Sequence, residues 1–384
     1  MIFHLDLDAF FVSVERILDP QLDGKAVVVG GDPDGRGVVA ACSYEARSFG
    51  IKSGMPIKTA FRLCPKGIYL HGHGDEYRRY SELVEDLLKK YAPIIEQASI
   101  DEFYVDFGGC EKIYGSLYLF AQKIQREVMD KLFLPISIGI GRNKMIAKIC
   151  SDFSKPMGIT YVYPGMEKDF LEPLPVEVIP GIGPVLQREL NNRGIYRISD
   201  ILKLSGDYLF VAFGKYGRDL WEKANGRGIE VLSTAEHKQK SISKETTFEK
   251  DVISKIFLEE VLSILTAKVC HTLRKKGFLA STITIKLRYS DFITYNRSKT
   301  VKFTNDEKEV YEVALKLLRD ANKRRVGVRL VGINLSNFTN FCFQEMLFIE
   351  EREKRERMLR AVDELRRKYG YSIIKSKGAG IDSI

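Results

Sequence analysis

The sequence predicts an α+β fold in which helices cover one face of a sheet. Before residue 163, short apolar runs of strand length alternate with longer segments of helical spacing. This alternation is typical of a sheet with helices packed against it. A second β-rich pattern returns at 241–338, and a chain of 384 residues with 45% hydrophobic content is long enough for about two to four domains.

The first elements follow one another along the chain. Two apolar runs flank the turn-rich segment 32–35, and we expect them to form a hairpin of strands at 26–31 and 37–41. Ser43 can cap a short helix that carries Tyr44 and Arg47 on one face. The further expected elements are helices at 75–91, 114–131 and 143–153 and strands at 99–107 and 135–140.

From residue 163 the pattern changes to short helices. Gly181 and Gly183 stand in a Pro-Gly-Ile-Gly turn ahead of a helix expected at 184–193. The two glycines and the helix N-terminus can present backbone N–H groups to a phosphate. This is the form of a helix-hairpin-helix, which binds a nucleic-acid backbone without reading its sequence. A plain turn between two helices is the alternative.

The polar stretch 230–240 lacks periodicity and is predicted to be a linker. Residues 240–340 then contain 20 Lys and Arg against 11 Asp and Glu, so that this module carries the whole formal charge of +9. Such a field suits a polyanion such as nucleic acid, although a solvated basic face is the alternative. Helices are expected here at 254–276 and 306–323. In the charged tail, an apolar stripe at helical spacing is formed by Met358, Val362, Leu365 and Tyr369.

Two acidic clusters lie beside strand-like runs. Asp6 and Asp8 end the first run, and Asp101 and Glu102 precede another. Carboxylates at the edge of a buried sheet repel one another and usually need a compensating cation. Oxygen ligands without nearby His or Cys suit Mg²⁺ or Mn²⁺, so Asp6, Asp101 and Glu102 could hold two such ions for phosphoryl chemistry. Strand-end or turn positions without a metal are the alternative.

Other candidate residues surround these acids. Phe10 and Phe11 follow the first cluster, and a ring facing the sugar of a bound nucleotide would exclude a 2′-hydroxyl, whereas core packing is the alternative. Tyr44, Arg47 and Lys155 could bind a triphosphate, or they could be ordinary surface residues. The segment 71–75, with two His and one Asp, suggests a second metal site but lacks a third nitrogen ligand nearby.

The composition also excludes several classes of protein. The N-terminus has no basic, apolar secretory signal, and no stretch approaches the roughly 20 apolar residues of a membrane span. We therefore expect a cytoplasmic protein without a membrane partner. The cysteines are scattered without a Cys-x-x-Cys pair, which argues against disulfides and structural zinc: Cys42, Cys64, Cys110, Cys150, Cys270 and Cys342.

Taken together, these motifs resemble the Y-family of translesion DNA polymerases, most closely its bacterial DNA polymerase IV type. They occur in the family's order and cover residues 1 to about 340. The matching segments are 6–15 (Asp-Leu-Asp-Ala-Phe-Phe-Val-Ser-Val-Glu), 40–47, 99–102 (Ser-Ile-Asp-Glu), 137–144, 154–156 (Ser-Lys-Pro), 180–183 (Pro-Gly-Ile-Gly) and 329–333.

The resemblance implies a multidomain right-hand polymerase with an antiparallel palm sheet, small fingers, a helical thumb and an α/β little finger. Its domains would be a palm at 1–8 and 73–162, fingers at 9–72, a thumb at 163–229, a linker at 230–240, a little finger at 241–340 and a tail at 341–384. The short fingers and the small side chains at 39–41 imply a roomy site of low fidelity. There is no spare length for a proofreading exonuclease.

The resemblance also implies a role for each candidate. Two Mg²⁺ ions, or Mn²⁺, would be held by Asp6, Asp101, Glu102 and the carbonyl of Leu7; one would activate the primer hydroxyl and the other would neutralise the leaving pyrophosphate. Phe11 would sense the sugar with Phe10 beside it, and the triphosphate grip would be Tyr44, Arg47 and Lys155. Primer-template DNA would be bound by Gly181 and Gly183 and by a strand that carries Arg324, Arg325 and Arg329. The enzyme is expected to be a monomer that uses deoxynucleoside triphosphates.

Beyond residue 340 one short motif stands out. Gln344, Leu347 and Phe348 form a Gln-x-x-Leu-Phe sequence that resembles the peptide with which such polymerases dock into the bacterial sliding clamp. Three other classes stay open from the residues alone: a nucleotide cyclase, a two-metal nuclease, and a non-catalytic protein that binds or tethers damaged DNA.

Overall fold

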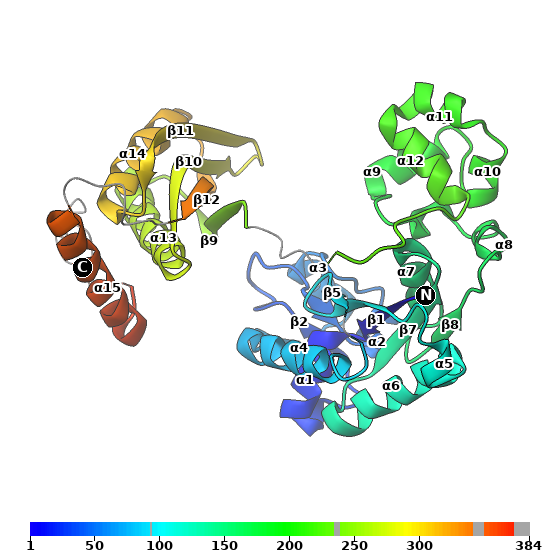
Figure 1. Ribbon diagram of the computed structural model, residues 1–384. Helices are drawn as coiled ribbons and strands as arrows, with labels where there is room; N and C mark the ends of the chain where they lie inside the picture. The colour runs from blue at the N-terminus through cyan, green and yellow to red at the C-terminus, as the bar shows by residue number, and fades with distance from the viewer. Residues whose placement is uncertain (93, 234–238, 341–348, 372–384) are drawn as a thin grey trace. The chain divides into compact units, whose positions relative to one another are not determined.

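The computed structural model describes residues 1–92, 94–233, 239–340 and 349–371 (Figure 1). The chain divides into two compact units, Met1–Ala235 and Glu236–Ile384. In the part of the chain that is described, none of the helices has the length and apolar character needed to cross a bilayer.

A five-stranded sheet forms the centre of the first unit, in the spatial order β5-β6-β1-β7-β8. Its strands are β1 (Ile2–Leu7), β5 (Ile95–Gln97), β6 (Glu102–Asp106), β7 (Ile136–Gly141) and β8 (Ile159–Tyr161). Neighbours are antiparallel except for β7 and β8, which run parallel. The predicted antiparallel sheet is thus confirmed with one parallel edge pair.

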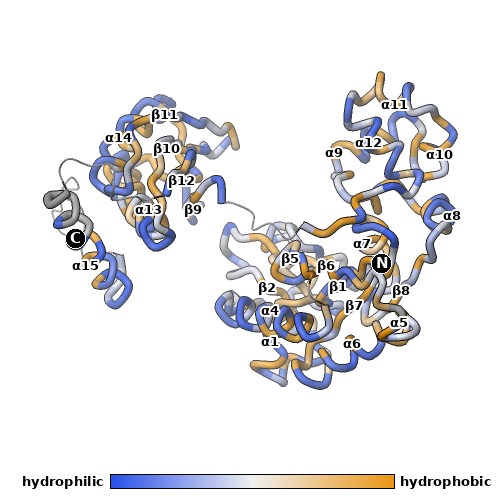
Figure 2. The backbone as a smooth tube through the Cα atoms, in the orientation of Figure 1, coloured by the Kyte–Doolittle hydropathy of each residue, from blue (hydrophilic) through white to orange (hydrophobic). Residues whose placement is uncertain are grey.

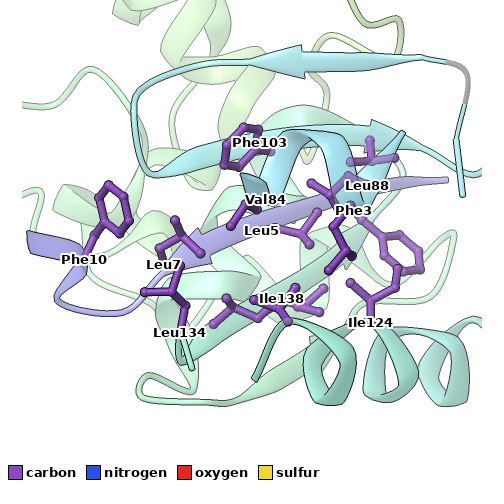
Figure 3. Close-up of a cluster of buried hydrophobic side chains, with 14 of the residues drawn as sticks. Phe3, Leu5, Leu7, Phe10, Val84, Leu88, Phe103, Ile124, Leu134 and Ile138 are labelled. Atoms are coloured by element: carbon purple, nitrogen blue, oxygen red, sulfur yellow. The ribbon is translucent and has the colours of Figure 1, made fainter. Parts of the chain in front are cut away.

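One face of this sheet is an apolar core. Side chains alternate across a strand, so Phe3, Leu5 and Leu7 of β1 all lie on the same face, against α4 (Gly74–Leu88) and α6 (Leu117–Leu132) (Figure 3). Hydrophobic residues recur along β1 and β7, in orange in Figure 2. The short α5 (Glu111–Tyr114) precedes α6.

The other face is covered by α7 (Lys144–Phe153), so the expectation of helices on one face only is wrong. His4 of β1 points to this side, where its Nδ1 lies 2.7 Å from the Ser151 hydroxyl of α7. The helix approaches closely because β7 carries glycine: a Cβ at Gly139 would lie 1.9 Å from the carbonyl oxygen of Ala147.

A small three-stranded sheet, β3-β2-β4, packs beside the central one. Its strands are β2 (Val27–Val29), β3 (Ala41–Cys42) and β4 (Ile68–Leu70), and its helices are α1 (Phe10–Leu18), η1 (Pro20–Leu22), α2 (Tyr44–Arg47) and α3 (Ile57–Leu63). The predicted pairing of two apolar runs is correct, but the second strand lies later than 37–41. Val38 instead forms an isolated bridge with Pro56, which displaces the ladder to Ala41. Ser43 caps α2, as predicted.

Short helices make up the rest of the first unit. They are α8 (Glu167–Leu171), η2 (Val176–Val178), α9 (Pro184–Asn191), α10 (Ile198–Leu202), α11 (Gly206–Phe213) and α12 (Lys215–Ala224). The segment predicted as a linker at 230–240 begins with an anchored part. Leu232 is 6% exposed and packs with Ile2 and Tyr104, and Ser233 donates its N–H to Glu96.

The second unit is an α/β module. Its antiparallel sheet has the order β11-β10-β12-β9, with β9 (Ser241–Val252), β10 (Phe278–Tyr289), β11 (Thr294–Thr304) and β12 (Val328–Asn340). Two helices, α13 (Lys255–Lys275) and α14 (Glu307–Ala321), share its core.

The tail helix α15 (Ile349–Tyr369) is attached to this module through charged residues. Asp363 receives hydrogen bonds from both Nε and Nη2 of Arg274, and Arg366 donates to both carboxylate oxygens of Glu307. These four side chains are nearly buried, at 3 to 7% exposure. Three residues of the predicted apolar stripe, by contrast, are exposed: Met358, Leu365 and Tyr369.

We expect Gly139→Ala to destabilise the first unit by about 3 kcal/mol, because α7 would have to move off the sheet. Urea unfolding measures the loss. Gly74→Ala is the matched control, since a Cβ there meets no atom within 4 Å. Equal effects of the two substitutions would contradict the close approach of α7.

Candidate active site

A pocket of about 230 Å³ in the first unit collects residues from distant parts of the chain. It contains all nine residues predicted to handle the metals and the nucleotide: Asp6, Leu7, Phe10, Phe11, Tyr44, Arg47, Asp101, Glu102 and Lys155. The further lining residues are Ala9, Ala40, Ala41, Ser53 and Asp152. Ala40 and Ala41 contribute small side chains to this lining.

Two of the acids face each other across the sheet. Asp6 of β1 stands directly opposite Glu102 of β6 in the antiparallel register, which places their Cβ atoms about 5 Å apart on the same face. This is the face that α7 covers. Like charges at such positions repel, so the arrangement needs a nearby cation.

Glu102 is held as an anion. His4 and the ammonium of Lys148 lower its pKa to about 2, against the opposing effect of burial. The His4 Nε2 atom is 3.6 Å from the carboxylate, which is long for a hydrogen bond, whereas Lys148 Nζ lies 2.5 Å away. Burial lowers the pKa of His4 itself. The lysine is therefore the partner that fixes this carboxylate.

Asp6 has a different electrostatic environment. Its side chain is 9% exposed, and burial raises its pKa to about 7 although the Lys155 ammonium lies only 2.7 Å from Oδ2. Lys155 Nζ is also 2.6 Å from Asp152. A divalent cation would favour the ionised form of Asp6 more strongly than one lysine does.

Asp101 lies in a bend just before β6. Its carboxylate accepts the Ser99 hydroxyl at 2.5 Å, and its carbonyl oxygen accepts the N–H of Leu7 at 3.0 Å. Within the described residues no three His, Cys, Asp or Glu side chains are gathered closely enough to hold a metal ion. The hard oxygen donors expected for Mg²⁺ line one pocket, yet two of them are paired with lysines and the third with Ser99. The donor set thus fits the ion once these side chains turn toward a common point.

Asp8 supports the site, a role that the sequence did not predict for it. It is 2% exposed and does not line the pocket. Its carboxylate accepts hydrogen bonds from the Ser137 hydroxyl at 2.8 Å, from the Tyr44 hydroxyl at 3.1 Å and from the N–H of Met157 at 2.8 Å. Asp8 therefore positions Tyr44 and the loop that carries Lys155. Only the Asp-x-Asp spacing hinted at this role, because its partners lie far away in sequence.

Phe11 is supported from behind by an aromatic stack. Its ring is parallel to that of Tyr77 at a centroid distance of 4.2 Å, and the Tyr77 hydroxyl donates to the buried Glu15. His73 also donates its backbone N–H to Glu15, at 3.0 Å. Phe10 is 2% exposed and belongs mainly to the core. The His-rich segment 71–75 therefore contributes to this packing, and the described residues contain no metal cluster there.

The remaining cationic candidates lie beside the acids. The Arg47 guanidinium stacks over the Tyr44 ring at 4.5 Å, and both side chains project from α2 into the pocket. Lys155 lies just beyond the end of α7. Two cationic side chains therefore line the pocket together with the acids.

The predicted hairpin before α9 has a fixed backbone. Gly181 has a φ of 103°, a conformation that favours glycine, and Gly183 caps α9 with Pro184 in its first turn. The Tyr216 hydroxyl donates to the carbonyl of Gly181 at 2.8 Å, and Lys223 Nζ donates to the carbonyl of Pro180 at 3.3 Å. These bonds tie the hairpin to α12.

The family resemblance implied that Arg324, Arg325 and Arg329 lie on one strand, and this expectation is wrong. Arg324 and Arg325 lie in the connection before β12, and only Arg329 is on the strand. The reason is local: Arg324 pairs with Asp291 at 2.6 Å, which keeps it in the bend. Arg329 stacks over Phe292 at 4.6 Å. The predicted clamp residues Gln344, Leu347 and Phe348 lie outside the described residues.

Comparisons with known proteins agree with this arrangement. The model of the impB/mucB/samB family matches residues 5–152, that of the family's C-terminal domain matches 239–345, and that of the IMS family HHH motif matches 164–195. The DNA polymerase IV of Dehalococcoides mccartyi strain CBDB1 is 40% identical over 382 residues, which cover 98% of this chain and 96% of the relative. The DNA polymerase IV of Listeria innocua serovar 6a is 39% identical over 346 residues, or 90% of this chain and 97% of the relative.

Solved structures give the same picture. A Y-family DNA polymerase chimera, Dbh-Dpo4(243-245)-Dbh, is similar with a TM-score of 0.78 and 32% identity over 88% of this chain and 99% of that chain. An insertion ternary complex of Dbh DNA polymerase has a TM-score of 0.60, also at 32% identity, over the same shares of the two chains.

We expect Asp8→Asn to lower the free energy of unfolding by about 2 kcal/mol, because the new amide N–H₂ would face buried donors. Urea unfolding of the full chain measures this loss. Asp75→Asn is the control, since the Asp75 side chain is 94% exposed and its substitution should change stability by less than about 0.5 kcal/mol. A fully stable Asp8 variant would refute the positioning role.

Proposed function

Because the chain belongs to the impB/mucB/samB family, the Y-family of DNA polymerases, and is a DNA-directed DNA polymerase, we propose that the pocket of its first unit is the site of nucleotide addition. There the enzyme extends a primer across damaged template bases with low fidelity. The supporting observation is that one pocket contains the acids, an aromatic ring and the cationic side chains. A nuclease or a cyclase would not need that combination.

Each group has a separate task in this proposal. Tyr44, Arg47 and Lys155 bind the triphosphate of the incoming deoxynucleotide, with Arg47 as a bidentate donor and Lys155 as a point charge. Phe11 lies against the sugar, and the Tyr77 stack keeps its ring from retreating when a 2′-hydroxyl approaches. Ala40 and Ala41 leave room for a distorted base pair, which lowers the discrimination between correct and incorrect bases.

The acidic edge would hold the metals. Asp6, Asp101, Glu102 and the carbonyl of Leu7 are the proposed ligands of two Mg²⁺ ions, with Mn²⁺ as the alternative. When bound, such ions activate the primer hydroxyl and neutralise the phosphates of the leaving pyrophosphate. The described lining of the pocket contains no histidine, and its acids are paired with lysines or assigned to the metals, so we expect water or substrate to take the hydroxyl proton.

DNA would be held by both units. The hairpin of Gly181 and Gly183 offers backbone N–H groups to a phosphate, and the carbonyl bonds from Tyr216 and Lys223 keep its backbone rigid. The second unit contributes the excess positive charge, and Arg325 is its exposed arginine near the start of β12. Docking of 344–348 to a sliding clamp, a cytoplasmic location and a monomeric state stay predictions of the sequence.

Primer extension tests the proposal directly. Wild-type chain with Mg²⁺ and deoxynucleotides should lengthen a labelled primer, and EDTA should stop it. Asp6→Asn and Glu102→Gln should each reduce the rate by about 10³-fold or more, since charge stabilisation supplies most of the barrier reduction. Glu96→Gln is a matched control, because Glu96 lies outside the pocket and pairs with Lys144. Primer shortening would indicate a nuclease, and binding without turnover a scaffold.

Sugar selection is tested at Phe11. Phe11→Ala should increase the relative use of ribonucleotides about 30- to 100-fold, the equivalent of about 2 to 3 kcal/mol of lost exclusion. Single-nucleotide kinetics with matched deoxy- and ribonucleotides measure the ratio. Phe61→Ala changes a Phe that is 39% exposed and outside the pocket, so it should leave the ratio unchanged. An unaltered preference in the Phe11 variant would reject the gate.

A further inference from the structure

Two lysines are paired with acids of the pocket, and one of them, Lys155, also lines it. Lys148 Nζ lies 2.5 Å from Oε1 of Glu102, and Lys155 Nζ lies 2.7 Å from Oδ2 of Asp6. Both lysines come from α7 or its immediate C-terminal extension. Each of the two opposed carboxylates therefore has its own ammonium group.

The backbone holds these ammonium groups in place. The close contact at Gly139 and the hydrogen bond between His4 and Ser151 fix α7 on the sheet. Ser151 lies about one helical turn after Lys148, so these contacts also fix the backbone that carries this lysine. The loop of Lys155 is fixed by the bond from the N–H of Met157 to Asp8. With side-chain exposures of 26% for Lys148 and 21% for Lys155, both ammonium groups are shielded from much of the solvent.

An ammonium group and a divalent cation compete for the same oxygens. Asp6 and Glu102 stand directly opposite each other. If either carboxylate lost its lysine, the two carboxylates would repel each other with less compensating positive charge nearby. A divalent ion held by Asp6 and Glu102 would offset this repulsion, but the lysines would have to give up their contacts with these carboxylates. Lys155, which would keep its contact with Asp152 at 2.6 Å, could then turn toward a negatively charged ligand in the same pocket.

We propose that Lys148 and Lys155 are tethered counter-ions that occupy the carboxylates until a divalent ion and a nucleoside triphosphate bind together. This inference rests on the proposed function, since it assumes that these carboxylates are metal ligands. Lys148 lowers the affinity of the site for metal alone. Lys155 links the two ligands, because a triphosphate that takes Lys155 releases Asp6 for the metal. By linkage, the metal must strengthen triphosphate binding by the same factor.

Metal binding without DNA or nucleotide tests the role of Lys148. The probe is Mn²⁺, followed by electron paramagnetic resonance in titrations of the full chain. Lys148→Met should bind Mn²⁺ about five- to tenfold more tightly than wild type, because it removes a partly buried competitor. Lys148→Arg, which keeps the charge, should stay near wild type. Glu102→Gln should weaken binding in every background and so assign the signal to this site.

The matched control is one helical turn earlier. Lys144 Nζ lies 2.5 Å from Glu96, and neither residue lines the pocket. Lys144→Met removes the same charge from the same helix and should leave the Mn²⁺ affinity within about twofold of wild type. Circular dichroism establishes that each variant is folded before it is titrated.

The coupling role of Lys155 is measured with a non-hydrolysable deoxynucleoside triphosphate. The analogue should raise the Mn²⁺ affinity of the wild type by a larger factor than that of Lys155→Met. Direct chelation of the ion by the analogue is the same in both proteins, so the difference between the two factors measures the contribution of Lys155. Equal coupling in the two proteins would overturn the role of Lys155. Unchanged or weaker Mn²⁺ binding by a folded Lys148→Met would overturn the counter-ion role of Lys148. Either failure leaves primer extension by the wild type intact, whereas absence of extension would reject the proposed function itself.

Discussion

Opposed negative charges on neighbouring strands are the constraint on which the first unit depends. Asp6 and Glu102 are cross-strand partners, largely shielded from water and within the range of strong mutual repulsion. The ammonium groups of Lys148 on α7 and of Lys155 in the following loop compensate this repulsion. The helix and the loop are both held by contacts with residues of the sheet or next to it. Gly139 contributes to this arrangement, because the absence of a Cβ lets that helix approach the sheet closely.

Successive residues of β1 point to opposite faces of the central sheet and serve different roles. In β1, Phe3, Leu5 and Leu7 build the apolar core, while His4 and Asp6 point to the polar side. A shift of the pairing by one residue would exchange these faces, so the core also enforces the position of the acids. Stability and the site are therefore specified by the same register, and the buried Asp8 extends this coupling to Tyr44 and to the loop of Lys155.

The fold class, most elements and the members of the pocket could be predicted from the sequence, because they depend on local periodicity and on short motifs. The pairing of Asp6 with Glu102 could not, because only the strand register reveals it. Lys148 and Asp8 were missed for the same reason: their partners are 46 and 129 residues away, at Glu102 and Ser137. The placement of Arg324 on a strand came from the family resemblance and was wrong, because β12 begins only at Val328 and Arg324 pairs with Asp291 in the bend before it.

The tail helix shows how charge can encode position. The hydrophobic effect is non-directional, so apolar contacts specify the position of a helix less strictly than paired charges do. The bidentate hydrogen bonds of Arg274 to Asp363 and of Arg366 to Glu307 are position-specific. A shift of the helix by one turn would leave four nearly buried charges without partners. These paired charges thus fix one position for the C-terminal helix on the module, while Met358, Leu365 and Tyr369 remain exposed to the solvent.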